Sequence, residues 1–67
     1  MPMTMTQRAA RLGISFSHLD KIYKGSRFPS WKLVERWRTE ALICKGYKWW
    51  RGAELKDIQA AINKVQA

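Results

Sequence analysis

The feature that most limits what this chain can fold into is its short length combined with a single cysteine. With 67 residues and only Cys44, it can form no intrachain disulfide. A domain of this size buries only about 60% of the surface that its unfolded chain exposes. Hydrophobic residues make up 46% of the sequence and include four tryptophans, which is typical of a folded domain rather than a disordered tail. We therefore expect one domain over residues 1–67, held by a compact core alone or with a partner.

Apolar spacing and capping residues predict an all-α domain of about four helices. The helices are expected at residues 4–12, 15–24, 30–44 and 53–66. Residues with side chains suited to N-caps precede the first three: Thr4 or Thr6, Ser15 and Ser30. Gly13 and Gly25 supply the positive-φ position at which helices commonly end.

Residues 45–52 carry glycines at both ends of a run of aromatic and basic side chains, without a helical period. We predict a connector there, and a short β-hairpin is an alternative. Trp31 and Trp37 are expected in the core as part of the apolar face of the third helix. Of Trp49 and Trp50, we expect one in the core and the other exposed in a dimer interface.

The positive charge is concentrated in the first three quarters of the chain. The net charge is +8, and residues 1–51 hold eleven basic and three acidic residues, whereas residues 52–67 hold two of each. A strongly basic small domain is expected to bind a polyanion, nucleic acid first. We therefore expect double-stranded DNA to meet residues 1–51, with the neutral remainder free for another task.

The arrangement of residues 4–25 indicates a helix-turn-helix. The two short helices meet at Gly13, and the small Ala9 lies four residues earlier, where the second helix must pack closely across the first. The stretch from Thr6 to Gly25, continued to Ser30, resembles the Cro and phage-repressor (XRE-like) family of helix-turn-helix regulators. The likeness covers about residues 4–43. Its matching positions are Ala9, Gly13, the apolar pair Leu19 and Ile22, Gly25, and the Pro-Ser helix start at Pro29 and Ser30.

Two departures from the family pattern accompany these matches. Family members usually carry a further helix before the motif, and Arg8 occupies a position that is commonly apolar. Both leave one side of the motif open, and the surplus of tryptophans is expected to cover it.

The resemblance implies that the second helix reads bases in the major groove. Its expected base-reading residues are Phe16, Ser17, Asp20, Lys21 and Lys24. Lys21 would reach guanine, Asp20 would accept a hydrogen bond from cytosine, and Phe16 would touch a thymine methyl group. Basic residues on the flanking segments would set the register by contacting phosphates: Arg8, Arg11, Arg27, Lys32 and Arg36.

The last expected helix carries one apolar stripe, formed by Leu55, Ile58, Ile62 and Val65 at spacings of three, four and three. We interpret this stripe as too long for one small core to cover, so it is expected to be shared with a second copy, or partly with Trp49 and Trp50. The sequence therefore predicts a homodimer that binds two half-sites of DNA.

No catalytic set, phosphate-binding loop or metal-ligand cluster is visible, so we expect no enzyme, no catalytic residue, no metal, no cofactor and no small-molecule ligand. No apolar run approaches the length of a membrane span, and no signal peptide is recognisable. The expected location is therefore the cytoplasm.

Two other functions stay open. An excisionase-like architectural protein would use residues 45–52 as a wing, and an antitoxin or other protein-binding inhibitor would use the helix-turn-helix only as a scaffold.

Overall fold

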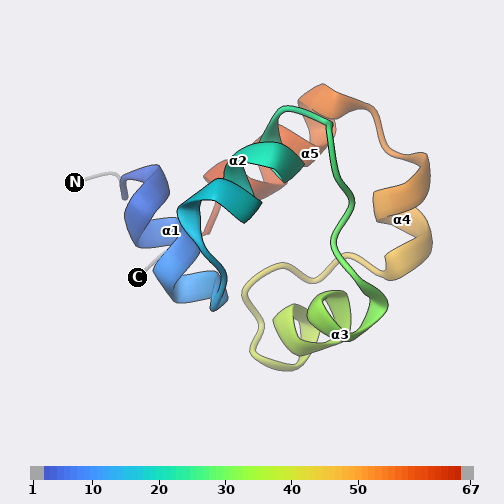
Figure 1. The fold of residues 1–67 in the computed structure, drawn as a ribbon. Helices are drawn as coiled ribbons and strands as arrows, with labels where there is room; N and C mark the ends of the chain where they lie inside the picture. Colours follow the sequence, from blue (N-terminus) through green and yellow to red (C-terminus); the bar gives the residue numbers. More distant parts are fainter. Residues whose placement is uncertain (1–2, 66–67) are drawn as a thin grey trace.

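The computed structural model describes residues 3–65, and these form five helices with no strand among them. The helices are α1 (Met5–Leu12), α2 (Phe16–Tyr23), α3 (Trp31–Thr39), α4 (Tyr47–Gly52) and α5 (Leu55–Asn63). The most extensive helix contacts join α1 to α2, α2 to α5, and α3 to α4. Figure 1 shows α5 behind α2, with α3 below them and α4 to the right. The expected all-α class is confirmed, and no helix in the described part is long and apolar enough to cross a membrane.

The first three helices begin where the sequence predicts. Thr4 and Gln7 form a capping box at the start of α1. Ser15 accepts a hydrogen bond from the His18 amide at 3.1 Å, and Ser30 accepts one from the Leu33 amide at 3.2 Å. Each of these side-chain oxygens satisfies an amide that has no partner inside the helix.

The same three helices end in one common motif. In each, the chain turns through a left-handed residue, and the next amide bonds back to a carbonyl five residues earlier. Gly13 (φ 74°) and Gly25 (φ 85°) serve α1 and α2 as expected. For α3 the left-handed residue is Ala41 (φ 56°), and the Leu42 amide bonds to the Trp37 carbonyl at 2.9 Å.

The prediction that the third helix continues to residue 44 is therefore wrong. The helix ends at Thr39, and the turn at Ala41 carries the chain back so that Ile43, only 5% exposed, enters the core. A left-handed backbone conformation is strained for alanine, because its Cβ lies too close to the backbone. The burial of Ile43 offsets that strain, and no local pattern in the sequence marks the turn.

The structure also corrects the expectation of a connector or hairpin at residues 45–52. Residues 47–52 form α4, although its N-cap Gly46 has no side-chain hydrogen bond to start it. A helix of six residues is unstable alone, and packing holds it here. Trp50 is completely buried, with its ring centroid 5.6 Å from that of Trp37. Trp49 is half-buried and stands edge-on to Trp50 at 5.2 Å.

The core is built around Trp37 and Trp50. It is completed by Ala9, Leu12, Leu19, Ile22, Val34, Ile43, Ile58, Ile62 and Val65. The Trp37 indole nitrogen donates a hydrogen bond to the Leu12 carbonyl at 2.9 Å, so it ties α3 to the end of α1. The expectation that Trp31 joins this core is wrong, because it lies on the first turn of α3 with 61% of its surface exposed.

The apolar stripe of the last helix is covered by the chain itself. Ile58, Ile62 and Val65 are at most 4% exposed, and only Leu55, at 41%, faces solvent. The Tyr23 carbonyl, at the end of α2, accepts a hydrogen bond from Gln59 Nε2 at 2.9 Å, which fastens α5 to α2. Three of the four residues that we expected to be shared with a second copy are therefore buried within this chain, in the core cluster that also contains Trp50 and contacts Trp49. The helix expected at residues 53–66 is also shorter at both ends, because α5 spans Leu55–Asn63, and residue 66 lies outside the described residues.

Replacing Trp37 with phenylalanine should lower the free energy of unfolding by about 2 kcal/mol, because the buried Leu12 carbonyl would lose its donor. Urea unfolding followed by circular dichroism measures this loss. Trp31→Phe on the same helix is the matched control and should stay within about 0.5 kcal/mol of the wild type, since an exposed side chain lacks these contacts. Equal stabilities for the two variants would contradict the role of the indole bond.

Ile62→Asp should unfold the isolated protein rather than only separate two copies. Placing a carboxylate at a fully buried position costs about 3–5 kcal/mol, which is comparable to the whole stability of a core this small. Leu55→Asp adds the same charge to the same helix at an exposed position and should fold normally. Circular dichroism and sedimentation distinguish the two outcomes, and a folded Ile62→Asp monomer would restore the seam interpretation.

Ala41→Gly should raise the free energy of unfolding by about 1 kcal/mol, because glycine adopts the left-handed backbone without a Cβ clash. Gly13→Ala is the reciprocal control and should destabilise the protein, since its Cβ would also lie 3.1 Å from the Arg36 guanidinium. Thermal unfolding measures the change in stability of each variant relative to the wild type. A destabilised Ala41→Gly would show that the turn is not strained.

Candidate nucleic-acid interface

α1 and α2 are two consecutive short helices that contact each other, in the order that the expected helix-turn-helix requires. Ala9 is buried where the two helices approach, and Gly13 makes the turn between them. Leu19 and Ile22, at 0% and 1% exposure, anchor the inner face of α2 in the core. These contacts fix the orientation of α2, and the opposite face of the helix is exposed to solvent.

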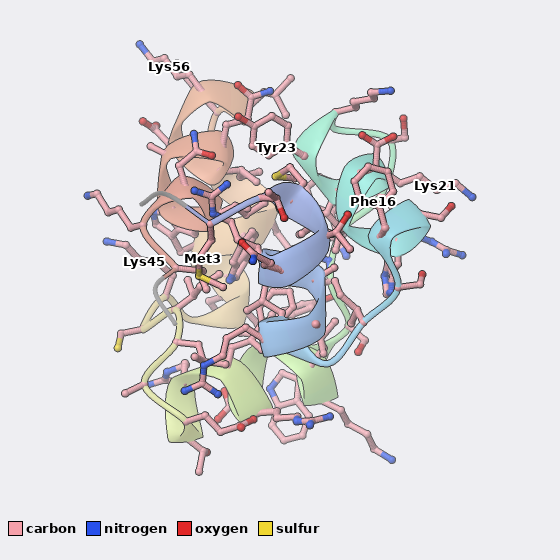
Figure 2. All side chains as sticks on the ribbon, turned by 90° about the vertical axis from the view of Figure 1, so that its left-hand side faces the viewer. Met3, Phe16, Lys21, Tyr23, Lys45 and Lys56 are labelled. Carbon is pink, nitrogen blue, oxygen red and sulfur yellow. The ribbon has the colours of Figure 1, made fainter. Side chains whose placement is uncertain are left out.

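The predicted base-reading side chains lie on this open face. Phe16 is 50% exposed, Ser17, Lys21 and Lys24 are exposed, and Asp20 is half-buried. Figure 2 shows Phe16 and Lys21 projecting from α2 on the same side of the molecule, away from the labelled Lys45 and Lys56.

The cations of α2 differ in what they are free to do. Lys24 forms an ion pair with Asp20 at 3.1 Å, one turn earlier on the helix. Such exposed pairs contribute about 0–1 kcal/mol and rearrange readily. Lys21 forms no ion pair with any described residue. It is the cation on this face whose charge is fully available to a ligand.

Arg8, one of the predicted phosphate contacts, bonds within the fold. Its side chain is half-buried, and its guanidinium donates to the Asn63 carbonyl at 3.4 Å, near the end of α5. It also lies 3.8 Å from the Met5 sulfur. A cation at the C-terminus of a helix is favourable because carbonyl groups there lack partners. Arg8 therefore fills the open side of the motif by joining α1 to α5.

The other predicted phosphate contacts lie around the motif. Arg11, Arg27, Lys32 and Arg36 are all exposed. The Arg36 guanidinium packs against the Gly13 backbone, which carries the turn before α2, and pairs with Glu40 at 3.0 Å. Arg27 lies in the segment after α2. Basic side chains are therefore found beyond both ends of the exposed helix.

Ion pairing leaves most of the positive charge unneutralised. Four of the five acidic residues form ion pairs, and the exception in the described chain is Asp57. Nine of the thirteen basic residues have no ion pair there, among them Arg11, Lys21, Arg27 and Lys32. A surface of this kind attracts polyanions over distances of about a Debye length, roughly 8–10 Å at physiological salt.

Sequence reasoning missed a cluster centred on Arg51. Its guanidinium lies 5.3 Å from the ring centre of Phe28 and 5.8 Å from that of Tyr47, and it donates to the Tyr47 hydroxyl at 3.0 Å. The spacing of four between Tyr47 and Arg51 is a helical signal that was available in the sequence. Contact with Phe28, which is distant in the chain, needs the tertiary structure.

A second surface feature is an open groove of about 340 Å³ between the segment after α3 and α5. It is lined by Leu42, Ile43, Cys44, Lys45, Trp49, Asp57, Ala60, Ala61 and Lys64. The Lys45 ammonium lies 5.3 Å from the centre of the Trp49 ring. Within residues 3–65, no group of three or more histidine, cysteine or acidic residues is placed to hold a metal ion.

The likeness to Cro and phage repressors rests on the residues named above. No family model matches this chain, and neither a curated protein nor a solved structure matches it.

Proposed function

We propose that this protein binds double-stranded DNA through α2 and acts as a sequence-specific transcription regulator of the Cro and phage-repressor kind. The observation that carries the proposal is the exposed face of α2, which presents the unpaired Lys21 between basic segments at both ends of the helix. As a DNA-binding protein it would act in the cytoplasm, by binding rather than catalysis.

Rigid placement of α2 supports this function. Ser15 caps the helix, Leu19 and Ile22 anchor it, and Gln59 holds its last carbonyl group. A recognition helix must enter the major groove with side chains already oriented, since ordering them on binding would consume affinity.

Charge and side-chain chemistry support a division of roles. Exposed arginines and lysines beside the helix would contact phosphates and contribute affinity that falls with salt. On the helix itself, Lys21 has the donor that guanine O6 and N7 accept, and Phe16 offers an apolar surface to a thymine methyl group. Asp20 would contact cytosine only if its pair with Lys24 opens.

A homodimer on two half-sites stays a prediction, but it must use a different surface from the buried stripe of α5. The excisionase-like alternative loses its expected wing, because residues 47–52 form a helix rather than a hairpin. A protein-binding function is favoured by one observation, the groove beside Trp49, which lies apart from the α2 face.

Selection of bound duplexes from a random pool tests the proposal directly, and we expect it to enrich one motif. Lys21→Ala should then weaken binding to the selected site by about 1–3 kcal/mol, with a smaller loss on random duplexes, if Lys21 makes a paired base contact. Lys56→Ala is the control, because Lys56 pairs with Glu54 and points to another side of the molecule. An absence of duplex binding at low salt, with retained binding to a protein partner, would favour the inhibitor function instead.

A further inference from the structure

Arg51 is held in an unusual setting for an exposed cation. It lies on the last turn of α4, close to the rings of both Phe28 and Tyr47, and it donates one hydrogen bond to the Tyr47 hydroxyl. Phe28 is itself 46% exposed, so the cluster faces solvent. No acidic side chain in the described chain pairs with this arginine.

Aromatic neighbours and acidic neighbours have different consequences for a guanidinium. Arg36 and Arg38 are paired with Glu40 and Glu35, so much of their charge is already matched. The rings beside Arg51 orient its planar group but carry no net charge. A guanidinium has five N–H donors, and the bond to Tyr47 uses one of them. The others are available, in a fixed orientation, to an anion such as a phosphate.

The position of this cluster connects it to α2. Phe28 belongs to the segment that leads from α2 to α3, and it follows Arg27 directly. Pro29 in the same segment is completely buried, which anchors the chain there. Figure 1 shows α4 beside this descending segment. Arg51 therefore lies beside the segment that follows the C-terminal end of α2.

We infer that Arg51 is a phosphodiester contact of the same interface, acting with Arg27 beyond the C-terminal end of α2. The inference rests on the proposed DNA binding and assigns α4 a part in it. The aromatic pair orients the guanidinium so that less side-chain entropy is lost when it meets the DNA backbone. Phe28 and Tyr47 are positioning residues in this arrangement.

The salt dependence of affinity for a duplex containing the selected site tests this role, because each lost phosphate contact lowers the slope of log K against log salt by roughly one unit. Arg51→Ala should show that loss, whereas Arg51→Lys, which keeps the charge, should retain most of the slope. Lys45→Ala is a matched control. It removes the same charge from a cation that also lies over an aromatic ring, but on the groove beside Trp49. It should leave the slope unchanged.

The outcomes separate the two proposals. If the wild type binds the duplex and Arg51→Ala has the slope of Lys45→Ala, the assignment of Arg51 is overturned while DNA binding stands. If the wild type binds no duplex at low salt, both proposals fall. Urea unfolding of each variant checks that the fold is intact. If Arg51→Ala unfolds, Arg51→Gln removes the charge but keeps a long polar side chain, and it should show the same loss of slope.

Discussion

The bond between the Trp37 indole and the Leu12 carbonyl joins two halves of this small fold. The most extensive helix contacts place α1, α2 and α5 in one group and α3 and α4 in another. Trp37 crosses between the groups, since it packs on Trp50 of α4 and bonds to the end of α1. An indole offers both a large apolar ring and one polar donor. The chain has no disulfide to join the two groups. The Trp37 side chain joins them instead, through the packing of its ring and through an oriented hydrogen bond.

The candidate DNA surface depends on that junction because it draws on both groups. Its centre, α2, belongs to the first group, whereas Arg36 and Arg51 come from the second. Arg36 reaches the Gly13 turn, and Arg51 reaches Phe28 beyond the other end of α2. If the two groups of helices shifted relative to each other, Arg36 and Arg51 would change position relative to α2. The packing of the core therefore determines how the parts of this candidate surface are arranged.

The neutral C-terminal quarter of the chain packs its apolar stripe into the protein's own core. Its apolar residues complete the core, and its polar residues fasten the end of α2 through Gln59. Arg8 occupies a position that is commonly apolar in the resembling family, and here it contacts the end of α5. The helix thus supports α1 and α2, and it also lines the open groove beside Trp49.

Local chemistry in the sequence determined the helix starts at Thr4, Ser15 and Ser30, the glycine stops, and the inner and outer faces of α2, because caps, positive-φ positions and helical period act within a few residues. The Ala41 turn, α4, the exposure of Trp31 and the burial of the α5 stripe were decided by tertiary structure alone. In each of these cases the free energy comes from contacts between residues distant in the chain, which outweigh weak or unfavourable local preferences. A sequence pattern shows that a side chain is apolar, but only the packed fold determines which other part of the molecule covers it.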